Sequence, residues 1–260
     1  MKRRFQNTIR NSGPPLIFIA ILLLLWQGIC QLELLPTFML PSPARVARAF
    51  VLDFPRLMEN LAVTLWEAFC GLGLSVAAAL VLALLMDANC FLKQSVTPVL
   101  LLTQTMPTIA IAPLLVLWMG QGAAPKIVLV FLTCFFPLTV GLLGGLAQAD
   151  EDAVRLLQSM GARKFDIYRF LKLPGALASF FSGLKISVTY SVVGAVIAEW
   201  LGGNAGLGVY MIRVKKSYSF DKMFAVILLV AVLSMVLVKL TELLEKRVMP
   251  WRYLNSSMKV

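Results

Sequence analysis

Long apolar stretches constrain this chain more than any other feature. Six of them are close to or above the roughly 20 residues that a helix needs to cross the hydrocarbon core of a bilayer. They cover about residues 15–32, 60–86, 96–119, 127–147, 180–201 and 223–244. Lipid offers exposed backbone groups no hydrogen-bond partner, and the stretches lack the strict alternation of barrel strands. The sequence therefore predicts an all-α integral membrane protein with about six transmembrane helices.

The composition excludes several classes of function. The 260 residues are 59% hydrophobic and 14% charged, whereas a soluble domain has about 25% charged residues. The chain has no histidine, which removes histidine metal sites and His-dependent catalytic triads. Its formal net charge of +11 comes from Lys and Arg between the apolar stretches rather than on one polar face, which argues against nucleic-acid binding. We expect contact with membrane lipid, no metal site and no catalytic residue.

The distribution of Lys and Arg predicts the orientation of the chain. Placing both termini on the inner side gives the inner connections the larger share of these residues, although a basic cluster at 213–222 opposes this. No small-residue cleavage pattern follows the first stretch, so we expect it to remain as a helix. The expected segments are an inner N-terminus (1–14), a first transmembrane helix (15–32), an outer loop (33–59), a core (60–247) with an inner loop (148–178), and an inner C-terminal tail (248–260).

The outer loop contains one candidate helix. Ser42 can cap a helix whose first residue is Pro43, and Val46, Ala49 and Phe50 then form an apolar stripe. This pattern predicts either a short amphipathic helix on the outer membrane face or an ordinary loop helix.

The inner loop predicts two short helices with a glycine between them. An acidic triplet at 150–152 suits a helix N-terminus, and Gly161 is placed to end that helix in a left-handed cap. A second helix over about 163–172 should stop before Pro174. Such a pair forms either a knob that a soluble partner can grip or a solvated loop. The second helix should expose Phe165, Tyr168 and Leu171.

Polar groups at membrane depth are costly and mark function by default. Pro98, Pro107 and Pro113 should break the third stretch, and the polar residues between them favour either a pathway lining or a structural kink. Lys185 can reach water at the inner end of its span. Glycines at 141, 144 and 145 are expected to let helices pack closely. The candidate pathway or gate residues are Glu67, Gln104, Thr105, Pro107, Tyr190 and Glu199, the last being alternatively a plain interfacial carboxylate or a docking point for an outer partner.

Several motifs, taken in order, resemble one protein family over about residues 38–250. Met160-Gly161-Ala162 with Phe165, Ile167 and Leu173-Pro174 is similar to the cytoplasmic "EAA" loop of ABC importer permeases. Arg155-Leu156-Leu157 stands where that motif has Glu-Ala-Ala, a departure typical of the nitrate, sulfonate and taurine branch. Further similar stretches are Leu40-Pro41-Ser42-Pro43, residues 104–114, Leu117-Trp118-Met119-Gly120, Phe135-Phe136-Pro137, Ala198-Glu199-Trp200-Leu201 and Gly206-Leu207-Gly208.

The resemblance implies a type I ABC importer permease fold in a bacterial cytoplasmic (inner) membrane. It implies a homodimer around a central pathway, two ABC ATPase subunits that carry ATP and Mg, and an extracytoplasmic solute-binding protein. Residues 180–191 and 199–203 resemble permeases for pyrimidine precursors of thiamine, the alternatives being aliphatic sulfonate, taurine or nitrate. The implied ATPase-coupling residues are Arg155, Gly161, Ala162, Arg163, Phe165, Asp166, Tyr168, Leu173 and Pro174.

Other classes of membrane protein fit the sequence less well. The chain contains no G-x-x-x-x-G-K-[ST] phosphate loop, so ATP hydrolysis is expected from another polypeptide. An intramembrane enzyme would need convergent nucleophile and base residues, and neither HExxH nor Gly-x-Ser-x-Gly occurs. An ion-driven secondary transporter would favour inverted repeats and paired acidic residues at the midplane, and no internal repeat is visible.

Overall fold

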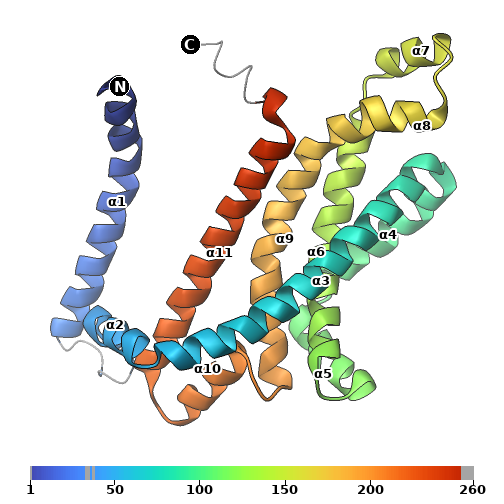
Figure 1. Cartoon of the computed structure of the whole chain (residues 1–260). Coiled ribbons are helices and arrows are strands. Elements are labelled where there is room, and N and C mark those ends of the chain that lie inside the picture. Colours follow the sequence, from blue (N-terminus) through green and yellow to red (C-terminus); the bar gives the residue numbers. More distant parts are fainter. Residues whose placement is uncertain (1, 33–35, 37–38, 253–260) are drawn as a thin grey trace. The chain divides into compact units, whose positions relative to one another are not determined.

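The computed structural model describes residues 2–32, 36 and 39–252, with side chains at residue 14 and from residue 17 onward. The described residues form helices joined by turns and contain no strand, which confirms the all-α prediction (Figure 1). The helices are α1 (Lys2–Gln31), α2 (Pro43–Leu52), α3 (Phe54–Ala88), α4 (Cys90–Thr105), α5 (Thr108–Met119), α6 (Ala123–Ala147), α7 (Glu151–Ser159), α8 (Lys164–Ile167), a π-helix (Tyr168–Lys172), α9 (Leu173–Leu201), α10 (Leu207–Lys216) and α11 (Phe220–Val248).

Backbone contacts divide the chain into two compact units. One consists of Met1–Met58 with Tyr210–Leu229, and the other of Glu59–Val209 with Val230–Val260. Helices α3, α10 and α11 each contribute to both units. All of the predicted coupling and pathway residues lie in the second unit.

Among the described residues, four helical segments are long and apolar enough to cross a membrane: α3, α6, the continuous run from α8 to α9, and α11. The bent pair α4–α5 makes a fifth if it counts as one span. Helix α1 adds a shorter apolar stretch over Ile17–Gln31. The prediction of about six spans therefore fits the structure approximately.

The third predicted span is broken at one proline rather than three. Helices α4 and α5 meet at an angle of 97° across Met106 and Pro107. Met106 is extended, as expected for a residue before proline, and Pro107 caps α5 without a side-chain hydrogen bond. Pro98 and Pro113 lie inside α4 and α5, so the prediction that they also break the span was wrong.

The second loop helix does not stop before Pro174, contrary to the prediction. Residues 164–201 form one 38-residue helical run, with a π-helical turn over Tyr168–Lys172 and Pro174 in the first turn of α9. Proline removes one backbone donor and crowds the carbonyl four residues earlier. The wider π-turn shifts bonding to the carbonyl five residues back, as in the bond from Leu173 N–H to Tyr168 C=O. The helix can therefore continue through the proline.

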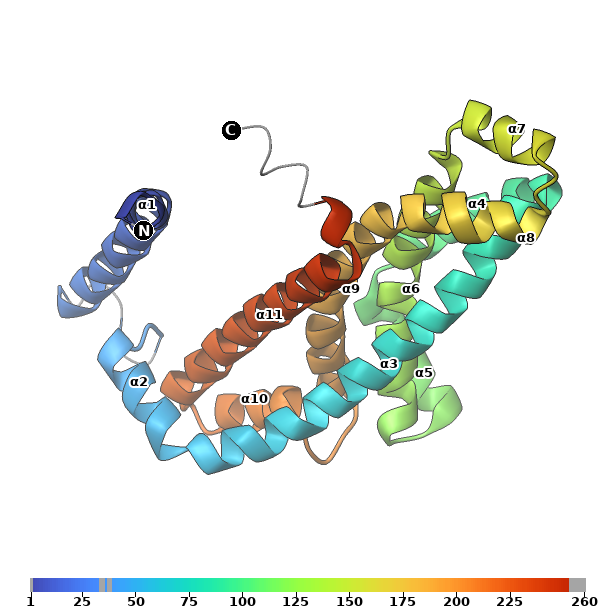
Figure 2. The ribbon, with the colours of Figure 1, turned by 45° about the horizontal axis from the view of Figure 1, so that its top comes forward.

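Close packing of α6 against α9 forms the centre of the second unit, and the two helices run side by side in Figures 1 and 2. A Cβ at Gly145 would lie 2.8 Å from Ala176 Cα, and one at Gly183 would lie 2.7 Å from the Pro137 carbonyl oxygen. Gly141 likewise faces the backbone of Ser179 at 3.0 Å. The expected packing role therefore fits Gly141 and Gly145, whereas a Cβ at Gly144 would meet nothing within 4 Å.

The first unit contains the predicted outer helix. Ser42 accepts a hydrogen bond from the Arg45 N–H, Pro43 is the first residue of α2, and Val46 and Ala49 are buried. At the end of α2, Asp53 Oδ2 accepts a hydrogen bond from Tyr210 Oη at 2.6 Å and pairs with Lys222 Nζ at 2.7 Å. These contacts join α2 to α10 and α11 within this unit.

Candidate functional site

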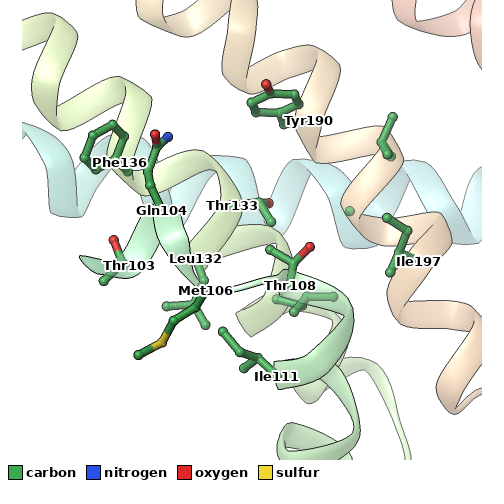
Figure 3. A pocket seen from close by; sticks show the side chains of 13 residues that line it. Thr103, Gln104, Met106, Thr108, Ile111, Leu132, Thr133, Phe136, Tyr190 and Ile197 are labelled. Atoms are coloured by element: carbon green, nitrogen blue, oxygen red, sulfur yellow. The ribbon is translucent and has the colours of Figure 1, made fainter. Parts of the chain in front are cut away.

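A cavity of about 510 Å³ opens between α4, α5, α6 and α9. The break at Pro107 turns α5 away from α4, so that the ends of both helices contribute side chains to the cavity wall (Figure 3). The residues that line the cavity are Thr103, Gln104, Met106, Thr108, Ile111, Leu129, Leu132, Thr133, Phe136, Tyr190, Val193, Gly194 and Ile197.

The cavity lining is apolar with a few neutral polar groups. None of the described residues that line it is charged. Thr103 and Thr133 donate their hydroxyl hydrogens to backbone carbonyls of their own helices. The amide of Gln104 and the hydroxyl of Tyr190 make no side-chain hydrogen bond to another described residue, so both can serve a solute. Aromatic side chains of Phe136 and Tyr190 are exposed to the same space (Figure 3).

A second hollow of about 570 Å³ continues from this cavity along α6 and α9. It shares Gln104, Phe136 and Tyr190 with the first and extends to Gln148, at the α7 end of α6. Ser179 and Ser182 of α9 add hydroxyl groups, and again no charged residue is among the described residues that line it. The two hollows thus adjoin each other at Gln104, Phe136 and Tyr190, and none of the described residues that line them is charged.

The predicted pathway residues separate into two groups. Gln104 and Tyr190 line both hollows, and Pro107 makes the break whose neighbours line the cavity. Thr105 is exposed, does not line either hollow, and donates its hydroxyl to the Leu102 carbonyl. Glu67 and Glu199 also lie outside both linings. Sequence reasoning missed the apolar lining, which includes Phe136 on α6 and Ile197 on α9. It also missed Thr133, which carries a signal, a hydroxyl within an apolar span.

Glu199 belongs to a buried hydrogen-bond network at the end of α9 opposite to α7 and α8. It is 1% exposed and accepts hydrogen bonds from Thr64 Oγ1 at 2.7 Å and from Gly208 N–H at 2.5 Å. The Thr64 hydroxyl in turn accepts from Leu207 N–H at 2.9 Å, and Asn60 Oδ1 accepts from Gly206 N–H at 2.9 Å. The turn after α9 is thereby attached to α3.

Two glycines allow this network to close. Gly206 has φ +122°, in the region that side chains rarely adopt, and the Glu199 carboxylate occupies the place of any Cβ there. At Gly208 a Cβ would collide with the Val196 carbonyl oxygen and approach the same carboxylate. The Gly206-Leu207-Gly208 motif is therefore shaped to receive Glu199.

Glu67 pairs with a lysine that the sequence placed in a connection. Lys126 Nζ lies 2.6 Å from Glu67 Oε1, and the side chains are 5% and 3% exposed. The other carboxylate oxygen, Glu67 Oε2, has no hydrogen-bond partner among the described residues. Lys185, expected to reach water, has a side chain that is 30% exposed and also pairs with Glu245 at 2.7 Å. The two acidic pathway candidates, Glu67 and Glu199, thus both have partners from other helices.

The predicted inner loop has the expected helix, glycine and helix. Asp150 accepts from the Asp152 N–H at the start of α7, and Gly161 has φ +83° where α7 ends. Asp166 accepts from the Arg163 N–H, which starts α8. Figure 1 shows α7 and α8 together at one end of α6 and α9.

The exposed apolar surface of the loop differs in part from the prediction. Phe165 is 69% exposed, as expected, and Met160 and Phe170 are exposed with it. Tyr168 and Leu171 are half-buried rather than exposed, because their turn packs back onto the helices. Tyr168 Oη donates to Asp87 Oδ2 at 2.5 Å. Of the other predicted coupling residues, Arg155 is exposed and pairs with Glu151 at 3.4 Å, Ala162 is half-buried, and Leu173 and Pro174 are half-buried at the start of α9.

Comparison with known proteins identifies one family. Residues 71–250 match the model of the "binding-protein-dependent transport system inner membrane component" family. The chain is 34% identical over 253 residues to the formylaminopyrimidine transport permease protein ThiX of Halalkalibacterium halodurans, covering 97% of this chain and 99% of that protein. It is 27% identical to the taurine transport system permease protein TauC of Escherichia coli K12, covering 90% of this chain and 87% of that protein.

Solved structures agree on the fold. A crystal structure of an amino acid ABC transporter with histidines superposes with a TM-score of 0.63 at 17% identity, covering 76% of this chain and 96% of that one. The type I ABC importer permease fold expected from the sequence is therefore confirmed, as is the resemblance to permeases of the taurine branch.

Proposed function

Because the chain belongs to the family of binding-protein-dependent transport system inner membrane components, we propose that it is the permease subunit of an importer for a pyrimidine precursor of thiamine. It forms the translocation pathway along α4, α5, α6 and α9. A separate ATPase subunit supplies the energy through the α7–α8 loop. This solute class is the one named for the formylaminopyrimidine permease.

The main support for this solute class is that none of the described residues lining the cavity is charged. None of the described residues lining either hollow is an Asp, Glu, Lys or Arg. Burying an anion without a cationic partner is costly, whereas a neutral heteroaromatic ring can lie between aromatic and aliphatic side chains. Gln104 has one acceptor and two donor hydrogens, which match the edge of a pyrimidine that carries amino and ring-nitrogen groups.

A second candidate solute is one that carries a sulfonate or nitrate group, namely taurine, aliphatic sulfonate or nitrate. The observation that favours it is the start of α5 in the cavity wall, where Thr108 is the first helical residue. Helix N-termini present free N–H groups and a partial positive charge to anions. That charge is partial, whereas a sulfonate carries a full one, so we rank this candidate second.

The partners follow from the same proposal. Two copies of the chain enclose the pathway, two ATPases with ATP and Mg bind the loops, and a solute-binding protein docks at the opposite face of an inner membrane. Both termini lie on the cytoplasmic side. The exposed Phe165 and Met160 on the tip of the loop offer the apolar contact for an ATPase cleft.

The test is uptake of radiolabelled formylaminopyrimidine by cells that lack this gene and by the same cells expressing the chain. We expect uptake that depends on the chain and is unchanged by a hundredfold excess of unlabelled taurine. Uptake equal in both cells, or taurine competition, would overturn the pyrimidine assignment.

Two variants separate the pathway from the loop. Gln104→Leu should reduce uptake about tenfold, the value of one hydrogen bond of about 1.4 kcal/mol, and leave the amount of membrane-inserted chain unchanged. Gly161→Trp should abolish uptake with the chain still inserted, because a side chain at φ +83° distorts the loop. Gly73→Trp is the matched control, since Gly73 faces open space on α3 and should keep normal uptake.

A further inference from the structure

The π-turn between the loop and α9 is held by one carboxylate from a different helix. Tyr168 and Lys172 are the first and last residues of this turn. Tyr168 Oη and Lys172 Nζ both reach the same oxygen, Asp87 Oδ2, at 2.5 and 2.6 Å. The Lys172 ammonium also lies 5.1 Å from the centre of the Tyr168 ring, which adds a cation–π contact. One oxygen atom of Asp87 therefore contacts both ends of the turn.

The position of Asp87 is unfavourable for a carboxylate unless it has such partners. It is the second-last residue of α3, where the helix dipole disfavours negative charge. Its side chain is 7% exposed, so water supplies little compensation. An acidic residue at this place is explained by its contacts with the turn rather than by the stability of α3.

A change of register in this turn would reorient the loop relative to α9. A π-turn carries one more residue than an α-turn, and each residue turns a helix by about 100°. Conversion of Tyr168–Lys172 to α-helix would therefore rotate α8, with Phe165, about the axis of α9. Such conversion turns Tyr168 around the helix axis relative to Lys172 and so shifts it from its present position beside Asp87 Oδ2.

We propose that Asp87 is a positioning residue for coupling, which fixes the π-register at the base of the loop and makes α3 move with it. This inference rests on the proposed role of the loop in binding an ATPase. When the loop is displaced, the force passes through Tyr168 and Lys172 to the end of α3 as well as along α9. Without Asp87 the turn changes register and absorbs the displacement.

The experiment compares Asp87→Asn with Glu242→Gln, an exposed carboxylate on α11 that serves as the control. Hydrogen–deuterium exchange of the purified full chain reports the turn directly and needs neither solute nor ATPase. We expect Asp87→Asn to raise exchange at 168–173 at least fivefold with the melting temperature changed by less than a few degrees. Glu242→Gln should match the wild type.

The proposed role of Asp87 in coupling is tested on the complex that co-purifies with the tagged chain. Asp87→Asn should lower uptake at least tenfold while ATP hydrolysis stays within twofold, so that more ATP is consumed per solute. A matching loss in Lys172→Met, with no further loss in the double variant, would show that both residues act through one contact. Unchanged exchange in Asp87→Asn, or uptake, hydrolysis and melting temperature falling together, would overturn the proposal. Absence of pyrimidine uptake by the wild type would instead count against the proposed solute, with the exchange result standing by itself.

Discussion

An aspartate, a tyrosine and a lysine meet in the same chemical arrangement next to each end of α3. At the start, Asp53 Oδ2 contacts Tyr210 and Lys222 at 2.6 and 2.7 Å. At the end, Asp87 Oδ2 contacts Tyr168 and Lys172 at 2.5 and 2.6 Å. The atoms and distances are nearly equal, so any difference in role must come from where the partners stand in the chain.

The partners differ in how many segments they join. Tyr210 and Lys222 come from two helices, α10 and α11, so the Asp53 group ties three segments of its unit. Tyr168 and Lys172 come from one turn, so the Asp87 group fixes the shape of that turn. Asp53 lies between the end of α2 and the start of α3, whose dipoles act on it in opposite senses, whereas Asp87 stands near the end of α3, where negative charge is unfavourable. The Asp53 group therefore ties separate segments together, whereas the Asp87 group has the role we propose for it, an adjustable joint.

Breaking the buried pair of Lys126 and Glu67 should lower the free energy of unfolding more than breaking either aspartate group. Lys126→Met leaves the Glu67 carboxylate buried without its cation, and we expect a loss of about 3–5 kcal/mol in the free energy of unfolding. The measurement is the melting temperature and the yield of folded chain in detergent. The double variant with Glu67→Leu should recover most of the loss, because no charge is then left unpaired. If the double variant is no better than the single one, the pair is not what stabilises this site.

Charge reversal should separate the two aspartate groups most clearly. Lys172→Glu places two carboxylates together at the π-turn, and we expect uptake to fall at least tenfold with a loss of about 1–2 kcal/mol in stability. Lys222→Glu should lower stability by a similar amount at Asp53. Its remaining uptake should scale with the amount of folded chain. The two variants would be compared by uptake per inserted chain, and equal specific uptake would erase the distinction between tie and joint.

The sequence predicted elements well where the signal is local. The Asp150 cap, the left-handed Gly161 and the outer helix from Pro43 are set by neighbouring residues, and the structure has them as expected. The roles of Glu67 and Glu199 depend on Lys126, Thr64 and Gly208, which come from distant segments.

Neutral residues proved the better guide to the cavity than charged ones. Gln104 and Tyr190 line it, whereas the buried carboxylates are held by other helices. This follows from energetics, since a buried charge is retained where partners surround it, and a path for a neutral solute needs no charge. The π-turn could not be read from the sequence, because it depends on how Pro174 and Asp87 meet the same segment.

Removal of one hydroxyl should have a smaller effect and still distinguish the groups. Tyr210→Phe and Tyr168→Phe each delete one hydrogen bond to an aspartate, worth about 1 kcal/mol. We expect Tyr210→Phe to lower the melting temperature by a few degrees without changing uptake per folded chain. Tyr168→Phe should change the melting temperature by a similarly small amount, but it should also raise hydrogen exchange at residues 168–173. Equal exchange profiles in the two variants would contradict the assignment of the joint to Tyr168.

The smallest expected effect is the pH dependence of the Asp53 group. Burial alone would raise the pKa of Asp53, but the hydrogen bonds from Lys222 and Tyr210 outweigh it and hold the pKa below its ordinary value of 3.8. A lowered pKa means that the contribution to stability is complete above pH 3.8 and is lost as the pH falls through the lowered value. Asp53→Asn should therefore cost less than about 1 kcal/mol at pH 7, since Lys222 is one-third exposed, and the difference from the wild type should shrink below pH 4. Melting temperatures of both proteins between pH 3 and 7 measure this, with Glu59→Gln, an exposed carboxylate on α3, as the control. A difference that grows on acidification would mean that Asp53 is protonated in the folded chain and holds Lys222 by something other than charge.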